Sequence, residues 1–209
     1  VKESKEKASH LLSIKKLSLG YTQPLFESVN FSMHSQDRVF IKGRNGAGKS
    51  TLVRTILSMY AGETLQATVL AGEIELGKDL RIGEYEQEIH QKYLEKGLAT
   101  AIKEAYEDCG IMIEDRRIKA LLAQYLFDPV LDANQLVESL SGGQKARFQI
   151  IKLLANNPNL LVLDEPTNHL DLPSIEELEN SLQTFHGGIL YISHDNYFIK
   201  KMGGKVIEI

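Results

Sequence analysis

The run Gly43-Arg-Asn-Gly-Ala-Gly-Lys-Ser50 is the most informative part of this 209-residue chain, because it matches the pattern G-x-x-x-x-G-K-S/T. The residues before it, Arg38-Val-Phe-Ile-Lys42, are typical of a buried strand. The residues after it, from Lys49 to about Met59, carry apolar side chains at helical spacing. A strand, a glycine-rich loop and a helix in this order predict a phosphate-binding loop rather than the alternative, a chance glycine-rich turn.

The chemistry of such a loop gives its residues separate roles. Glycines let the backbone turn so tightly that successive N–H groups converge on phosphate oxygens, and the start of the helix adds N–H donors and the positive end of its dipole. We expect Lys49 to bridge the β- and γ-phosphates, Ser50 to offer its hydroxyl to Mg²⁺, and Thr51 to hydrogen-bond the α-phosphate. The nucleotide phosphate-binding residues expected in this region are Gly43, Asn45, Gly46, Ala47, Gly48, Lys49, Ser50 and Thr51.

A second motif, Val137-Glu-Ser-Leu-Ser-Gly-Gly-Gln144, stands at the start of a long amphipathic helix that we expect at about 142–156. A hydroxyl, glycine amides and a helix dipole that point at one place form an anion site. The residues concerned are Ser141, Gly142, Gly143 and Gln144. The alternative for this motif is a plain helix N-cap.

A third motif, Leu160-Leu-Val-Leu-Asp164-Glu165, is an apolar strand that ends in two carboxylates. Acidic groups at the end of a buried strand need a compensating cation. We expect Asp164 to belong to the Mg²⁺ shell and Glu165 to polarise the attacking water. The alternative is a strand that runs into a helix-capping acid.

Together these motifs resemble an ATP-binding cassette (ABC) ATPase domain, and the resemblance extends from Leu11 to Ile209. Gly43–Thr51 looks like its Walker A element, Leu140–Gln144 its signature and Leu160–Glu165 its Walker B element with the catalytic glutamate. The resemblance implies ATP and Mg²⁺ as cofactors. It also implies a composite site, completed by the signature of a second ABC domain in the same longer chain or in a homodimer.

Four further site residues follow from the resemblance alone. Tyr21 is placed as the adenine-stacking aromatic, Gln87 as the Q-loop glutamine that contacts Mg²⁺ and the lytic water, Asp171 as the D-loop aspartate and His194 as the switch histidine. Taken singly, Tyr21 fits a half-buried strand aromatic, Gln87 a solvated polar residue and His194 a strand-end cap. Asp171 alone fits the N-cap of a helix that begins with Pro173 at its first position.

Strands that alternate with helices predict an α/β, P-loop NTPase fold with a mostly parallel sheet, an N-terminal antiparallel part and an inserted helical subdomain. We expect a linker remnant at 1–10 and a single ABC domain at 11–209, with the core at 11–87 and 140–209 and the insert at about 88–139. The last elements expected are strands at 188–192 and 205–209 and a helix near 196–202.

Composition limits the partners that this chain can have. The net charge of −4 gives no support to a nucleic-acid site, although it leaves binding through a local patch open. No apolar stretch approaches the roughly 20 residues that direct membrane insertion needs. The single cysteine, Cys109, suits a reducing cytosol, so we expect a cytoplasmic protein.

The runs Glu165-Pro-Thr-Asn-His-Leu-Asp171 and Ile82-Gly-Glu-Tyr-Glu-Gln87 resemble the ABC-F family more than transporter ATPases. Members of that family have two ABC domains and act on the ribosome as translation factors. The charged segment ahead of Leu11 suggests the second of those domains. Lys42 and Arg44 depart mildly from the family pattern around Gly43.

Two other functions remain open from the sequence. One is the ATP-binding subunit of an ABC membrane transporter. The other is a nucleotide-binding switch without turnover, against which the presence of Glu165 and His194 argues.

Overall fold

The structure is a computed structural model, and it describes residues 9–86, 88–168 and 170–209. The expected linker therefore lies almost entirely outside the described residues, although His10 already begins the first strand. Gln87, the expected Q-loop glutamine, also lies outside them.

The described strands form two sheets. The first is antiparallel in the order β2-β1-β4, with bounds His10–Gly20 (β1), Pro24–His34 (β2) and Thr68–Leu76 (β4). The second is parallel in the order β5-β6-β7-β3-β8, with bounds Arg38–Lys42 (β3), Ile82–Tyr85 (β5), Leu160–Asp164 (β6), Gly188–Ile192 (β7) and Lys205–Glu208 (β8). The expected α/β class, with a parallel sheet and an antiparallel part, is confirmed.

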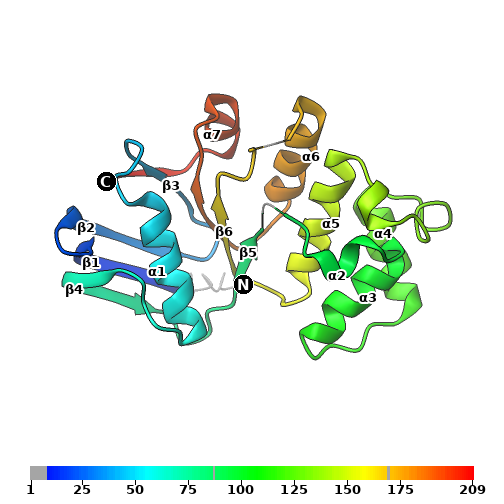
Figure 1. Ribbon diagram of the computed structural model, residues 1–209, viewed down its shortest axis with the longest axis horizontal. Coiled ribbons are helices and arrows are strands. Elements are labelled where there is room, and N and C mark those ends of the chain that lie inside the picture. Colours follow the sequence, from blue (N-terminus) through cyan, green and yellow to red (C-terminus); the bar gives the residue numbers. More distant parts are fainter. Residues whose placement is uncertain (1–8, 87, 169) are drawn as a thin grey trace, which may run out of the picture.

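The helices between residues 88 and 139 follow one another in the chain and lie together in the structure (Figure 1). In Figure 1 the antiparallel sheet lies at one end of the molecule and helices α2, α3 and α4 at the other, with the parallel sheet between them. The bounds are Lys49–Ala61 (α1), Gln91–Leu94 (α2), Leu98–Asp108 (α3), Asp115–Gln124 (α4), Val137–Ser139 (the 3₁₀ turn η1), Gly142–Leu154 (α5), Leu172–Gln183 (α6) and Asn196–Met202 (α7).

Apolar side chains that alternate along β6 divide the interior into two cores. Leu160 and Val162 pack with α1 and the antiparallel sheet, whereas Leu161 and Leu163 pack with α5, α6 and the helices between 88 and 139. This alternation is the period-2 geometry of a strand that is buried on both faces. The parallel sheet is therefore covered by α1 and the antiparallel sheet on one face and by helices on the other, and its strand ends are left to form a site.

Two expectations need correction. The helix expected to begin with Pro173 begins one residue earlier, at Leu172, because Asp171 caps it by accepting the N–H of Ser174 at 3.1 Å. No element was expected where β4 and β5 lie. Strand β4 shows little burial along its length and contains Gly72, so its order comes from pairing with β1 and not from a local hydrophobic pattern.

Candidate functional site

The loop between β3 and α1 depends on glycine at its last turn. Gly46 and Gly48 have φ of 80° and 96°, in the left-handed region that other residues avoid. A Cβ atom on Gly48 would also lie 3.0 Å from Cδ1 of Phe26 and 3.1 Å from Cβ of Leu25. The loop can therefore follow this path only because these positions lack side chains.

Lys49 begins α1 and points back into the loop that precedes it. The side chain is only 8% exposed, and its Nζ donates to the carbonyl oxygens of Gly43 and Arg44, each at 3.0 Å. The first turn of α1 contains no acidic residue. A buried ammonium beside a helix N-terminus, without a carboxylate in that turn, has the charge and the donors that a polyphosphate requires.

The register of the parallel sheet brings the two expected acids to the same edge as this loop. Phe40 on β3 and Leu163 on β6 both pair with Tyr191 on β7, so the strands end side by side. Asp164 ends β6, and Glu165 follows with a positive φ of 51° while its N–H donates to the carbonyl of Ile192 at 3.0 Å. The end of β7 thus holds the backbone of Glu165 in an uncommon conformation.

Glu165 and His194 are brought into contact. One carboxylate oxygen of Glu165 accepts the backbone N–H of His194 at 3.1 Å, and the other lies 3.3 Å from Nε2 of the ring. The side chain of Glu165 is 15% exposed, whereas that of His194 is 60% exposed. A sheltered carboxylate beside an open imidazole is an arrangement suited to proton transfer at the edge of a cavity.

Lys49 and His194 line the same hollow, which has a volume of about 480 Å³. Its wall also includes Gly43 and Ser193. The structure thus gathers the expected phosphate-binding lysine and the expected switch histidine around one space.

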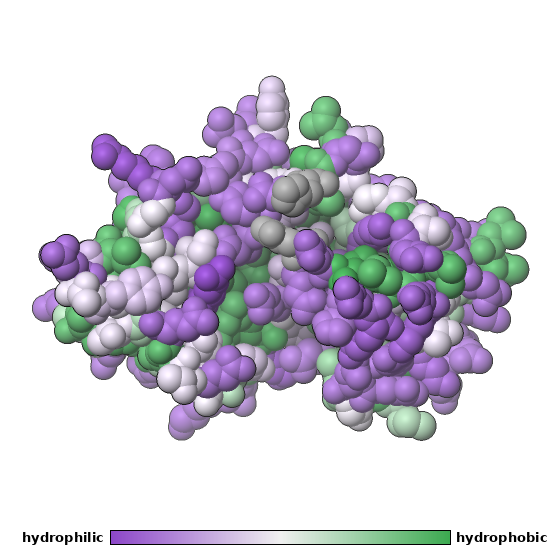
Figure 2. Space-filling view, in the orientation of Figure 1, coloured by the Kyte–Doolittle hydropathy of each residue, from purple (hydrophilic) through white to green (hydrophobic). Residues whose placement is uncertain are grey.

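Asp164 lines a second recess of about 620 Å³, between α1 and α2. Its other polar walls include Arg54, Glu84 and His90, and it opens in the middle of the face drawn in Figure 2. Partial loss of hydration, together with the carboxylates of Glu86 and Asp164, raises the pKa of Glu84. Three carboxylates therefore lie near one another at this edge of the sheet, with Arg54 and Lys152 as the neighbouring cations.

The expected signature residues lie apart from both spaces. Of the described residues, 141–144 line neither the 480 Å³ hollow nor the 620 Å³ recess. Ser141 is the N-cap of α5: its hydroxyl accepts the N–H of Gln144 at 3.2 Å, and the Gln144 side chain accepts the N–H of Ser141 at 2.9 Å. Gly143 packs so closely on α6 that a Cβ there would lie 2.3 Å from a carboxylate oxygen of Glu177.

The two remaining expected residues are exposed. Tyr21 follows the end of β1, is 57% exposed and lines a small pocket beside Thr51. It is therefore no half-buried strand aromatic, and its ring is open to a flat ligand. Asp171 caps α6, and its bonds from the hydroxyl and the N–H of Ser174 hold the pKa of its carboxyl below the usual value.

Sequence reasoning missed the polar residues on the buried side of α5. Arg147 and Gln149 are 9% and 3% exposed, although they stand in an otherwise apolar run with Phe148 and Ile150. The signal available was polarity on the core face of an amphipathic helix, where each polar group needs a specific partner.

The fold and the loop geometry define this chain as a P-loop NTPase domain. Comparison with known families then specifies it: the chain belongs to the ABC transporter family, whose model matches residues 26–168, and it is an ABC ATPase domain. The family expected from the sequence is confirmed.

Curated relatives include ABC-F members. The chain is 36% identical over 95% of its length to ABC transporter F family member 2 of Arabidopsis thaliana, and 32% identical over 89% to ATP-binding protein Uup of Escherichia coli. It spans only 28% and 33% of the lengths of these two proteins.

Solved structures confirm the fold. An ATP-binding cassette of an ABC transporter aligns with a TM-score of 0.74 at 19% identity, covering 96% of this chain and 87% of that one. The ADP conformation of such a cassette aligns with a TM-score of 0.71 at 20% identity, covering 92% and 84%. No described helix of the present chain combines the length and apolarity that crossing a bilayer requires.

Proposed function

We propose that this chain binds ATP with Mg²⁺ and hydrolyses it in a site that a second ABC domain completes. The observation that carries the proposal is the convergence of Lys49, Glu165 and His194 at one edge of the parallel sheet. We assign the domain to 11–209, with the core at 11–87 and 140–209 and the helical subdomain at about 88–139.

Binding rests on the loop and on the start of α1. The backbone amides from Gly46 to Ser50 surround the phosphates, and the Lys49 ammonium exchanges its bonds to the Gly43 and Arg44 carbonyls for phosphate oxygens. Tyr21 offers its exposed ring to the adenine. Asn45 and Thr51 supply further polar contacts to the phosphates.

The residues that would hold Mg²⁺ are Ser50, Asp164 and Gln87. The oxygen donors of these side chains suit a hard cation, and Asp164 stands beside further carboxylates that favour positive charge. When bound, Mg²⁺ neutralises charge on the β- and γ-phosphate oxygens.

Hydrolysis rests on Glu165 and His194. The carboxylate of Glu165 accepts a proton from the attacking water, and the fixed N–H of His194 keeps that carboxylate oriented. The exposed His194 ring donates a hydrogen bond to the γ-phosphate, and Gln87 helps to align the water.

The facing domain supplies the rest of the site. Gly142 lies against Ser174, next to the Asp171 cap, so the starts of α5 and α6 form one surface. We infer that residues 141–144 on this surface contact the ATP of the partner domain, and that Asp171 lies at the junction as the D-loop aspartate.

We further propose that the domain belongs to an ABC-F translation factor that acts on the ribosome in the cytoplasm. ABC transporter F family member 2 of Arabidopsis thaliana supports this role, since it is 36% identical to this chain over 95% of the chain's length. The recess between α1 and α2 favours a second candidate, the ATP-binding subunit of a membrane transporter, because a membrane partner needs a concave docking place beside the site.

Phosphate release tests the enzymatic proposal. We expect the 209-residue chain to release phosphate slowly, with a specific activity that rises with protein concentration as domains pair. Glu165→Gln should abolish release while ATP still binds. High specific activity that is independent of concentration would contradict the composite site, and release by Glu165→Gln at the wild-type rate would contradict the assigned base.

Sedimentation distinguishes the two biological roles. The full-length protein that contains this domain, trapped with ATP by Glu165→Gln, should co-sediment with ribosomes through a sucrose cushion. Recovery with membrane vesicles, and not with ribosomes, would support the transporter candidate.

A further inference from the structure

The middle of α5 holds the chain on both sides of position 87. Gln149 is 3% exposed, and its Nε2 donates to the carbonyl oxygen of Glu86 at 2.8 Å and to that of Glu88 at 3.2 Å. A single amide group thus joins the end of β5 to the segment that leads into α2.

Of the Gln149 side-chain amide, only the NH₂ group forms hydrogen bonds with the described residues. Its oxygen is buried and has no hydrogen-bond partner among the described residues, which disfavours glutamine relative to an apolar residue. The two bonds to the Glu86 and Glu88 carbonyls are therefore the interactions that an apolar residue of the same size could not replace.

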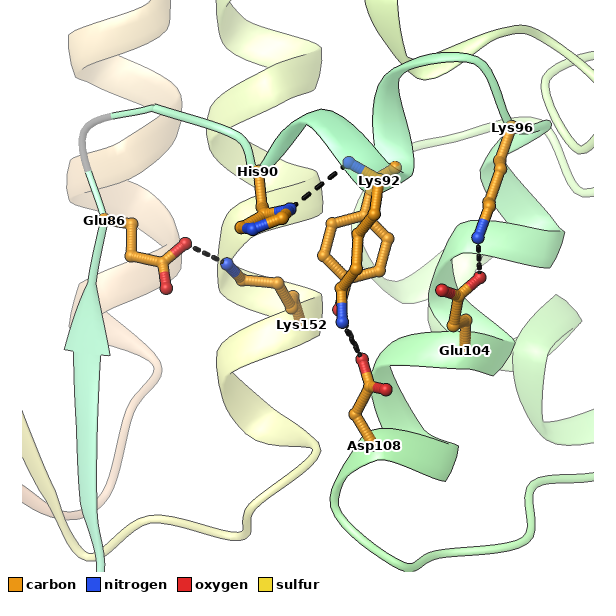
Figure 3. Close-up of polar contacts among 8 residues, drawn as sticks. Glu86, His90, Lys92, Lys96, Glu104, Asp108 and Lys152 are labelled. Carbon is orange, nitrogen blue, oxygen red and sulfur yellow. Dashed lines mark hydrogen bonds and ion pairs between the residues drawn. The ribbon is translucent and has the colours of Figure 1, made fainter. Parts of the chain in front are cut away.

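A second contact one turn later acts on the same segment. Lys152 lies three residues after Gln149, on the same face of α5, and forms an ion pair with the side chain of Glu86. Figure 3 shows these two side chains pointing toward each other from α5 and from the end of β5. Backbone and side chain of Glu86 are thus both held by α5.

Residues 90–96, which follow this segment, form polar contacts with the helical subdomain. His90 accepts the N–H of Lys92 at 3.2 Å, and Lys92 and Lys96 form ion pairs with Asp108 and Glu104 of α3 (Figure 3). The connection from β5 is therefore joined to α5 by Gln149 and Lys152, and to α3 by Lys92 within α2 and Lys96 just after it.

The same helix begins with the signature motif. At 1.5 Å per residue, Gln149 lies only about 10 Å along the axis from Gly142. The backbone hydrogen bonds of α5 therefore connect residues 142–144 to Gln149, and Gln149 to the Glu86 and Glu88 carbonyls.

We propose that Gln149 is a positioning residue for hydrolysis, because its bonds to the Glu86 and Glu88 carbonyls connect the signature helix to the backbone on both sides of the proposed Q-loop glutamine. This inference rests on the proposed roles of Gln87 and of residues 141–144. It adds a direct connection between the part of the domain that contacts the partner's ATP and the part that aligns its own water.

Hydrogen exchange tests the connection without any nucleotide. In Gln149→Leu, which keeps the size but removes the donors, peptides that cover 86–92 should exchange about 10-fold faster, while peptides of α1 and β3 are unchanged. Gln183→Leu, the same change on an exposed position of α6, should leave 86–92 unaffected. If Gln149→Leu loses the fold, the unbranched Gln149→Met replaces it. Unaltered exchange at 86–92 would overturn the inference.

Kinetics then separate positioning from a purely structural role. Gln149→Leu should lower kcat by about 10-fold to 100-fold and change KM for ATP by less than about 3-fold. In a Gln87→Ala background the same change should have no further effect, since the residue to be positioned is absent. An equal loss in both backgrounds would exclude positioning through Gln87. A wild-type chain without ATPase activity would contradict the proposed function, whereas the exchange result would still decide whether Gln149 holds the segment.

Discussion

The carboxylate of Glu165 contacts His194 twice, through the backbone N–H at 3.1 Å and through Nε2 of the ring at 3.3 Å. These residues are 29 positions apart and come from the ends of adjacent parallel strands. The carboxylate that we propose as the base is therefore held in part by the residues that follow β7. Four predictions follow from this edge of the sheet and from the helices that begin beside it.

His194→Ala should lower the rate of ATP hydrolysis by about 100-fold, because the ring contact to Glu165 and the donor to the γ-phosphate are both lost. ATP affinity should change much less, since Lys49 and the loop amides remain. Steady-state phosphate release and equilibrium nucleotide binding measure the two effects. His186→Ala removes an exposed histidine elsewhere and should change neither quantity. A parallel loss of binding and rate in His194→Ala would indicate a binding role only.

Lys49→Ala should weaken ATP binding by at least about 30-fold, because the loss of a buried charge pair costs about 2–5 kcal/mol. Titration with a fluorescent ATP analogue measures the dissociation constant. Lys15→Ala, which removes an exposed lysine from its ion pair with Glu73 on the antiparallel sheet, is the matched control and should bind normally. If Lys49→Ala bound ATP as tightly as the wild type, the loop would not be the phosphate site.

Gly48→Ala should destabilise the protein more than Gly62→Ala. Both glycines have positive φ, of 96° and 70°, so each substitution introduces backbone strain of about 1 kcal/mol or more. Only at Gly48 does the new Cβ also crowd Phe26 and Leu25, whereas nothing lies within 4 Å at Gly62. Urea unfolding measures the difference, and ATP affinity should fall in Gly48→Ala alone. Equal effects at the two positions would contradict the packing of the loop on β2.

Asp171→Ala should reduce stability in a pH-dependent manner. Bonds from Ser174 hold the pKa of the Asp171 carboxyl below its unfolded value, so the cap stabilises the protein fully above that value. As the pH falls through the lowered folded pKa, the carboxylate is protonated and this contribution is lost. The difference in free energy of unfolding between wild type and Asp171→Ala should thus be greater at pH 7 than in acid, and it should shrink as the pH falls through the lowered pKa of the folded state. A difference that stays constant over this range would exclude the charged cap.

Local pattern predicted the elements that surround the site. β3, β6 and β7 are short apolar runs buried on both faces, and α1 and α5 carry strong helical periodicity, so each is recognisable from its own residues. β4 was missed because it is an exposed edge strand. Pro173 was expected at the first helical position and is the second, because the helix begins at Leu172, directly after the Asp171 cap.

The features of the candidate site also fall into two groups, those that the local sequence predicts and those that depend on the tertiary structure. The phosphate loop, the acids at the end of β6 and the family itself could be predicted from residues 43–51, 140–144 and 160–165, because glycine spacing and charge at a strand end are local properties of the chain. The contact of Glu165 with His194, the burial of Lys49 beneath its own loop and the bonds of Gln149 to the Glu86 and Glu88 carbonyls could not. They depend on the order and register of parallel strands and on the packing of α5, which join residues far apart in sequence and leave no periodic trace along it.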